Sequence, residues 1–181
     1  MNKEKIKTYI ENLSKGGEFG IGLLDYFFAK LVLVIKGRYA FKELIDGLSH
    51  ENQYIVYQVV DALGKIKNKQ AIPYLKEMLK KSDLWGVTAC SLGVALIRLG
   101  DREGVDFLKE KITNPSVHRD TRIGAAKALI RLKIKNVFRK DEKIDFGGGT
   151  MTDEWSKVLQ GLVEKLREIG DSDYFPHSSL I

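Results

Sequence analysis

Apolar residues recur at helical spacing along most of the chain. One segment carries Val56, Val59, Val60, Leu63 and Ile66, which stand three or four positions apart. This spacing places them on one face of a helix. Alternation of apolar and polar residues, which is typical of strands, is scarce, and the whole chain contains three prolines. The pattern predicts an all-α chain.

The helical pattern also repeats with a fixed period. A shift of 33 residues superimposes one apolar pattern on the next, and a fainter copy precedes them at a shift of 31. The positions that recur at 33 residues are Ala62, Leu63 and Ile66, then Ala95, Leu96 and Leu99, then Ala128, Leu129 and Leu132. One helix pair cannot bury its apolar stripe alone, so successive pairs must stack and share a core. The period therefore predicts a helical-repeat solenoid.

Each copy consists of a first helix, helix A, then a short turn and a second helix, helix B. The turns contain residue types that tolerate a left-handed backbone or cap the next helix. They are Lys36-Gly37, Lys67-Asn68 and Gly100-Asp101. Pro73 falls in the first turn of its helix B, where the missing N–H costs little.

The segment TRIGAAKALIRL, residues 121–132, resembles the first helix of HEAT-like repeats of the phycobilisome-lyase (PBS lyase) type, which belong among the armadillo-like helical folds. The matching residues are Arg122, Ala125, Ala126, Ala128 and Leu129. The resemblance covers residues 23–135. It implies an α-α superhelix, a right-handed solenoid of about four HEAT-like helix pairs with N- and C-terminal capping helices. The arginine position holds Val56 and Ala89 in other copies, so no regular ladder of arginines is expected.

We expect one solenoid domain over residues 1–181, a length that can bury a core without disulfides. Its parts are an N-terminal capping helix and loop (1–22), the repeats (23–135), an irregular insertion (136–151), a final helix (152–169) and a tail (170–181). The final helix carries an apolar stripe, and Thr150 or Thr152 can cap its start. The stripe is Trp155, Leu159, Leu162, Leu166 and Ile169.

Composition indicates which kinds of partner and which cellular compartment to expect. Thirty Lys and Arg residues against 24 Asp and Glu give a net charge of +6, a mild bias toward acidic partners. The amino terminus lacks the apolar core of a signal peptide, and the apolar stretch 23–35 is too short and too charged to span a bilayer. Cys90, the sole cysteine, has apolar neighbours. We expect a buried thiol, a reducing, cytoplasmic location and no membrane partner.

No residue pattern points to catalysis. The histidines, His50, His118 and His177, are scattered, which argues against a metal site. The GGGT segment at 147–150 lacks the lysine and the preceding strand of a phosphate-binding loop. No nucleophile with a neighbouring base is recognisable. We therefore expect no enzyme activity, no metal and no cofactor.

Two surfaces could bind a partner. The first is the B-helix face, whose charges are of mixed sign and suit a protein better than a polyanion, although a simply solvated face fits equally well. Its residues are Lys42, Asp46, Lys76, Glu77, Lys80, Asp106, Lys109 and Glu110. Trp85 precedes a helix A and is expected in the core, with an exposed anchor as the alternative.

The second surface is a basic ridge at the turns between helix A and helix B. Such cations also offset the dipole at a helix C-terminus, which is the structural alternative to binding. The ridge consists of Arg38, Lys65, Lys67, Lys69, Arg98, Arg102, Arg131, Lys133 and Lys135.

The leading hypothesis is a non-catalytic scaffold that mediates protein–protein interaction through its B-helix face. One alternative is nucleic-acid or polyanion binding on the basic ridge. Another, suggested by the resemblance, is an accessory subunit similar to bilin lyases.

Overall fold

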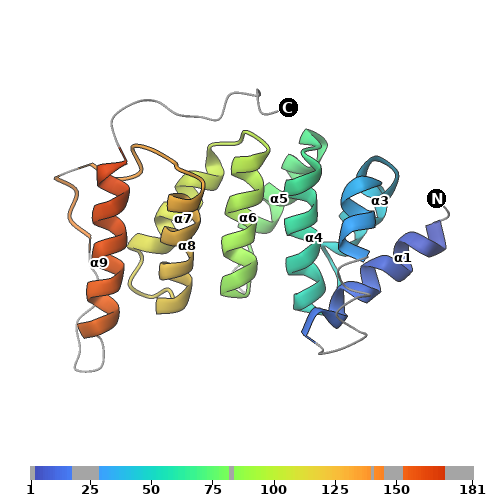
Figure 1. Cartoon of the computed structure of the whole chain (residues 1–181), viewed down its shortest axis with the longest axis horizontal. Helices are drawn as coiled ribbons and strands as arrows, with labels where there is room; N and C mark the ends of the chain where they lie inside the picture. The colour runs from blue at the N-terminus through green and yellow to red at the C-terminus, as the bar shows by residue number, and fades with distance from the viewer. Residues whose placement is uncertain (1–2, 18–28, 82–83, 140, 145–152, 170–181) are drawn as a thin grey trace. The chain divides into compact units, whose positions relative to one another are not determined.

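The computed structural model describes residues 3–17, 29–81, 84–139, 141–144 and 153–169 (Figure 1). These residues form helices joined by turns and irregular segments, with no β-strand among them. The predicted all-α fold of helical repeats is confirmed. The chain divides into two compact units, residues 1–99 and 100–181, and each is described by itself.

The first unit holds most of the predicted repeats. Its elements are α1 (Lys3–Asn12), the 3-10 helix η1 (Leu13–Gly17), helical residues 29–35, α3 (Gly37–Gly47), α4 (Gln53–Ile66), the 3-10 helix η2 (Lys69–Ala71), α5 (Ile72–Leu79) and α6 (Gly86–Arg98). The A helices α4 and α6 pack side by side (Figure 1). The B helices α3 and α5 each pack against the following A helix, which is α4 or α6. Successive helix pairs therefore stack as the period predicts.

The turns end the helices largely through the chemistry that their residue types predict. Lys67 ends α4 in the left-handed region, with φ of 57°, and Gly100 takes φ of 85°. The side-chain oxygens of Asn68 and Asp101 then accept hydrogen bonds from the N–H groups of Gln70 and Glu103, at 3.0 and 2.9 Å. These caps satisfy amides that the new helix leaves unpaired.

Gly37 departs from this scheme. The backbone passes from residues 29–35 into α3 without a left-handed residue, because Lys36 has φ of −96°. A Cβ atom on Gly37 would lie 2.5 Å from Cγ1 of Ile66. Gly37 therefore allows close packing against α4 and does not serve as a left-handed turn residue.

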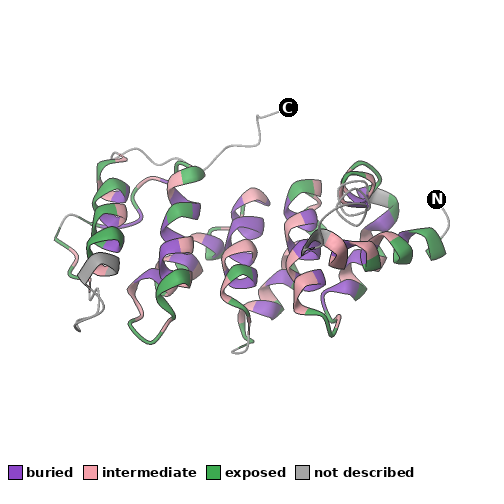
Figure 2. Ribbon diagram, turned by 60° about the horizontal axis from the view of Figure 1, so that its bottom comes forward, coloured by how far each residue is buried: buried purple, intermediate pink, exposed green. Residues whose placement is uncertain are grey.

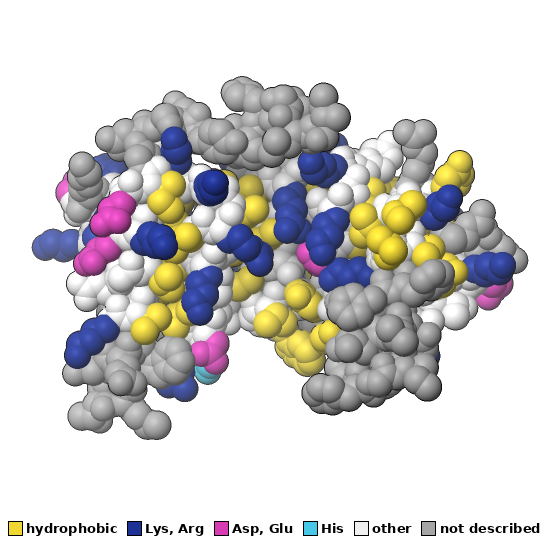
Figure 3. Space-filling view, viewed as in Figure 1, with side chains coloured by type: hydrophobic (Ala, Val, Ile, Leu, Met, Phe, Trp, Pro, Cys, Tyr) yellow, Lys and Arg dark blue, Asp and Glu magenta, His cyan; other side chains and the backbone are white. Residues whose placement is uncertain are grey.

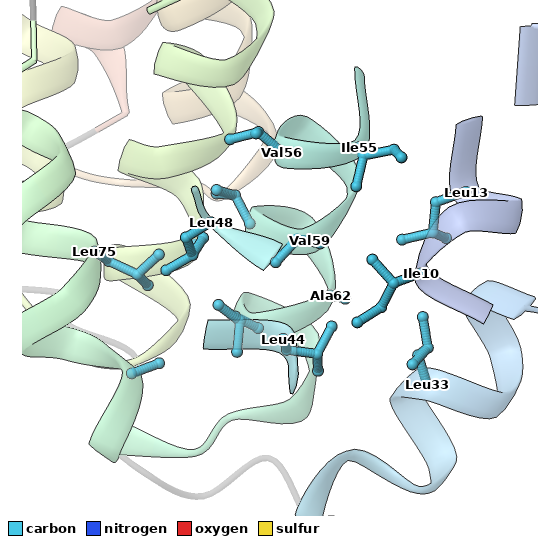
Figure 4. Packing of buried hydrophobic residues seen from close by; sticks show 14 of the residues in the cluster. Ile10, Leu13, Leu33, Leu44, Leu48, Ile55, Val56, Val59, Ala62 and Leu75 are labelled. Carbon is cyan, nitrogen blue, oxygen red and sulfur yellow. The ribbon is translucent and has the colours of Figure 1, made fainter. Parts of the chain in front are cut away.

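The core of the first unit forms where the repeated apolar positions meet. Leu44, Val59, Leu63 and Leu96 are fully buried, and α1 adds Ile10 from its last turn. Figure 4 shows side chains from α1, residues 29–35, α3, α4 and α5 converging on this core. Buried and exposed residues share the B helices α3 and α5, whereas α4 and α6 are buried or half-buried except at Lys65 and Val87 (Figure 2). This is the distribution expected of stacked amphipathic helices.

The second unit contains α7 (Glu103–Thr113), α8 (Arg119–Arg131) and α9 (Asp153–Glu168), with α8 packed against both other helices. Leu108 and Leu129, copies of Leu75 and Leu96, are fully buried. In α9 the buried residues are Leu159, Val163 and Leu166. Val163 therefore takes the central place that the predicted stripe gave to Leu162, which is half-buried. Thr150 and Thr152 lie outside the described residues, and so does the side chain of Trp155.

The segment after α8 is irregular, but three of its side chains enter the core of the second unit. Ile134, Val137 and Phe138 are each about 95% buried. Lys133 and Asn136, which precede Ile134 and Val137, both have positive φ. In the described part of the chain, no helix combines the length and the apolar character needed to cross a membrane.

Candidate functional site

Three cations from three successive A helices converge on one carboxylate in the first unit. Nζ of Lys30, from residues 29–35, lies 2.8 Å from Oδ2 of Asp61 in α4. Nζ of Lys65 lies 2.8 Å from the same oxygen. Nη1 of Arg98, from α6, lies 3.2 Å from Oδ1. Lys30 also donates to Oε1 of the buried Gln58, at 2.9 Å. We call Lys30, Asp61, Lys65 and Arg98 the Asp61 cluster.

The repeat itself brings the Asp61 cluster together. Asp61 and Lys65 stand four residues apart on α4, so their side chains share one face of the helix. The 33-residue shift carries Lys65 to Arg98, and the 31-residue shift carries Lys30 to Asp61. Equivalent positions on stacked helices become neighbours. The sequence therefore held the signal for this cluster, but Lys30 and Asp61 stand outside both of the predicted surfaces.

The cluster keeps its central carboxylate charged and carries excess positive charge. Burial raises the pKa of Asp61, but hydrogen bonds from Lys30 and Lys65 outweigh it and hold the pKa below its usual value. One negative charge thus meets three positive ones. The cluster is only partly shielded from water, since the side chains of Lys65 and Arg98 are 41% and 27% exposed.

Two of the residues predicted for the basic ridge of the first unit belong to the Asp61 cluster. These two residues, Lys65 and Arg98, share Asp61. Lys67 and Lys69 lie exposed at the turn that follows α4. The side chain of Arg38 lies outside the described residues. Ridge positions here are therefore interrupted by a carboxylate instead of presenting a single sign of charge.

The ridge members of the second unit lie near the ends of α7 and α8. Arg102, Arg131 and Lys133 are exposed, and Lys135 is half-buried. Lys133 follows α8 with φ of 54°. Arg131 and Lys133 stand at the C-terminus of α8, where cations interact favourably with the helix dipole, whereas Arg102 precedes the N-terminus of α7, where they do not.

On the B-helix face of the first unit, opposite charges meet one another. Lys80 and Glu77 form a 2.7 Å ion pair at the end of α5, and both side chains are more than 70% exposed. Lys42 and Asp46 are exposed on α3, while Lys76 is half-buried. Exposed pairs of this kind contribute little to stability and leave little net charge.

The B-helix face of the second unit is engaged by its own chain. Lys109 pairs with Glu142 at 2.9 Å and lies over the Phe138 ring, 5.2 Å from its centroid. Glu110 pairs with Lys111. Although partial burial raises it, these contacts and a hydrogen bond from Asn114 hold the pKa of Glu110 below its usual value. Asp106, also on α7, is exposed.

The first unit exposes several large apolar side chains. Trp85, expected in the core, is 51% exposed, so that expectation is wrong. The reason is local: Trp85 takes an extended conformation at the start of α6, and Leu84 packs against the core in its place. Among the described residues of this unit, the other large apolar side chains that are exposed are Leu31, Ile35, Tyr39, Tyr74 and Val87, with exposed fractions of 49–68%.

The described residues hold no cluster of three or more His, Cys, Asp or Glu side chains that could bind a metal ion. Nε2 of His50 donates to Glu11 at 3.3 Å, and its Nδ1 accepts the N–H of Asn52. The Nδ1 atom of His118 accepts the N–H of Asp120 and caps α8. His177 and residues 147–150 lie outside the described residues.

Cys90 behaves as a thiol within a packed helix. Burial raises its pKa to about 11, so the reactive thiolate is scarce at neutral pH. This agrees with the interpretation of Cys90 as a small hydrophobic residue.

Comparison with known families agrees with the repeat architecture. A family model described as HEAT repeats matches residues 29–92, which run from the helical residues 29–35 into α6. This match supports a HEAT-like repeat protein. Among curated proteins no significant match was found.

Proposed function

We propose that the chain is a non-catalytic scaffold that binds a protein partner. The HEAT repeats match supports this role, because proteins built of HEAT repeats commonly act as interaction scaffolds. The observation that carries the proposal is the set of large apolar side chains that the first unit leaves exposed, including Trp85 and Val87. Exposed aromatic and aliphatic residues near charged ones are typical of protein-binding surfaces.

Two surfaces of the first unit remain candidates for this role. The B-helix face offers charges of both signs, but its Lys80 and Glu77 are paired with each other. The side formed by the A helices offers net positive charge at the Asp61 cluster, with Leu31 and Val87 exposed on the same helices. The polyanion alternative is less favoured, because nucleic acids select an uninterrupted track of cations.

The test is recovery of the partner from the cells that make the protein. The tagged full chain should co-purify with one protein in roughly stoichiometric amount. A Trp85→Ser/Val87→Ser variant should lose it, because both side chains lie at the start of α6 and are half exposed. Val158→Ser is the matched control, since Val158 is 44% exposed in the second unit.

Purification of the chain alone, in wild-type and variant forms, would contradict the proposal. Co-purifying nucleic acid would instead support the polyanion alternative. Visible absorption from a bound tetrapyrrole would support the accessory role that the phycobilisome-lyase resemblance suggests.

A further inference from the structure

We propose that the Asp61 cluster binds an acidic amphipathic segment of the protein partner, with Lys65 and Arg98 as the residues that receive its carboxylates. The inference rests on the proposed scaffold function and adds the chemistry of the partner. It also moves the binding site from the B-helix face to the outer side of the A helices.

The first step is that Lys65 and Arg98 can accept a further anion without giving up Asp61. Arg98 directs Nη1 to Asp61. A guanidinium has five N–H donors in a planar fork that matches a carboxylate, and an ammonium has three. Both side chains remain partly exposed, at 27% and 41%. A second carboxylate can therefore bind beside Asp61.

The second step is pre-organisation. Long basic side chains on a surface lose rotamer freedom when they bind, and this weakens association. Here the carboxylate oxygens of Asp61 hold Nζ of Lys65 at 2.8 Å and Nη1 of Arg98 at 3.2 Å before any partner binds. Part of the entropic cost is therefore met in folding, and Asp61 acts as a positioning residue for the two cations.

The third step is that the excess positive charge of the chain resides mainly in this unit. Residues 1–99 contain 15 Lys and Arg against 10 Asp and Glu, whereas residues 100–181 contain 15 against 14. The first unit therefore accounts for +5 of the net +6. Such a field steers acidic partners toward the first unit and favours their approach to the cluster.

The fourth step selects an acidic protein segment over a nucleic acid. Apolar side chains are exposed on the A helices that supply the cluster: Leu31 follows Lys30 and is 57% exposed. Val87 lies 11 residues before Arg98 on α6, about three helical turns, so both face the same side. In Figure 3, dark-blue side chains gather over α4 and α6 with yellow ones beside them. A peptide that presents both acidic and apolar side chains matches both features, whereas the phosphates of a nucleic acid would match only the positive charges.

The probe is a fluorescent helical peptide of repeated Glu and Leu pairs, titrated into the full chain and followed by anisotropy. The test variant is Lys65→Gln/Arg98→Gln, which leaves Lys30 to pair with Asp61. The control variant is Lys42→Gln/Lys80→Gln, which removes the same charge from the B-helix face. We expect the test variant to lose affinity at least about tenfold and the control to lose about threefold or less.

Equal losses in the two variants would overturn the proposal, because they would indicate general attraction by net charge. Tighter binding of a labelled single-stranded DNA than of the peptide, sensitive to the same test variant, would also overturn it. So would unchanged binding of a peptide in which Gln replaces every Glu. Circular dichroism of each variant ensures that only folded proteins are compared.

If the native partner co-purifies but neither it nor the peptide responds to Lys65→Gln/Arg98→Gln, the scaffold function stands and this site is wrong. If no protein partner co-purifies, the proposed function itself fails.

Discussion

At the scale of single residues, Asp61 and Arg122 are two polar side chains whose positions the stacking of helices determines. Asp61 receives cations from its own helix and from both neighbouring A helices. Arg122 is 4% exposed in α8, and its Nε donates to the carbonyl of Ile112 near the end of α7 at 2.9 Å. Asp61 joins three successive A helices, and Arg122 joins the consecutive helices α7 and α8.

Asp61 gives stability an acid dependence. Its pKa in the folded chain lies below the ordinary value of 3.8, so its contribution is fully present above that pH and is lost as the pH falls through the folded pKa. We expect wild type to be more stable than Asp61→Asn by about 1.5–3 kcal/mol at pH 7. The difference, measured by urea unfolding, should shrink below pH 3.8. An advantage that persists unchanged at pH 2 would contradict this role.

Arg122 should contribute through the carbonyl that it satisfies. Arg122→Met keeps much of the apolar stem but leaves the Ile112 carbonyl without this donor. We expect a loss of about 1–3 kcal/mol in the free energy of unfolding. Arg119→Met is the matched control on the exposed side of the same helix and should change stability by no more than about 0.5 kcal/mol. Equal effects of the two substitutions would show that the buried hydrogen bond is not important.

At the scale of helices, the close approach of α4 and α6 depends on Gly64. A Cβ atom at this position would lie 2.8 Å from Cα of Ala95 and 2.9 Å from its Cβ. These distances are shorter than van der Waals contact. The small residues Gly64 and Ala95 therefore allow the two A helices to stack with their backbones close together.

Gly64→Ala should consequently destabilise the chain although alanine favours helix. Forcing α4 and α6 apart costs about 1–3 kcal/mol, which exceeds the propensity gain of up to about 1 kcal/mol. Gly161→Ala on α9 is the matched control, because a Cβ there meets no atom within 4 Å. In thermal unfolding, the midpoint temperature should be lower than that of wild type for Gly64→Ala and higher for Gly161→Ala. An increase for both would mean that the helices are not in contact at Gly64.

The helices themselves could be predicted because their apolar periodicity and their turn residues agree. Leu63, Leu96 and Leu129 stand at one repeat position, and all three are fully buried. Trp85 and Gly37 could not be assigned in this way. Trp85 is a large apolar residue in a link, where no periodicity indicates which side faces the core. The role of Gly37 depends on the distance to Ile66, a residue of the next pair.

The candidate site was less predictable than the helices. Two of its cations, Lys65 and Arg98, were predicted as parts of a ridge because they recur at 33 residues. The partner that joins them, Asp61, lies one turn earlier on α4 and has no acidic copy at Val94. The repeat shifts relate the positions that meet in the cluster, but the single carboxylate is not repeated, so its contacts with all three cations emerge only when the helices are stacked.

At the scale of the whole chain, the two units differ in net charge, in their match to HEAT repeats and in their exposed apolar residues. The first unit carries most of the net positive charge, the residues that match HEAT repeats and nearly all the large apolar side chains that are exposed in the described residues. In the second unit, Lys109 and Glu110 of the B-helix face are paired within the chain. These differences are the reason why we propose that the partner binds the first unit.

The most direct test of this account is photo-crosslinking of the full chain in the cells that produce it. A photoreactive phenylalanine derivative would replace Leu31 or Val87, which are exposed on the A helices that carry Lys30 and Arg98, and in separate variants Lys42 or Lys80 on the B-helix face. The account predicts that positions 31 and 87 crosslink the same protein, whose crosslinked peptide is rich in Asp and Glu, and that positions 42 and 80 do not. Crosslinking of that protein from positions 42 and 80 alone, or of no protein from any position, would contradict it.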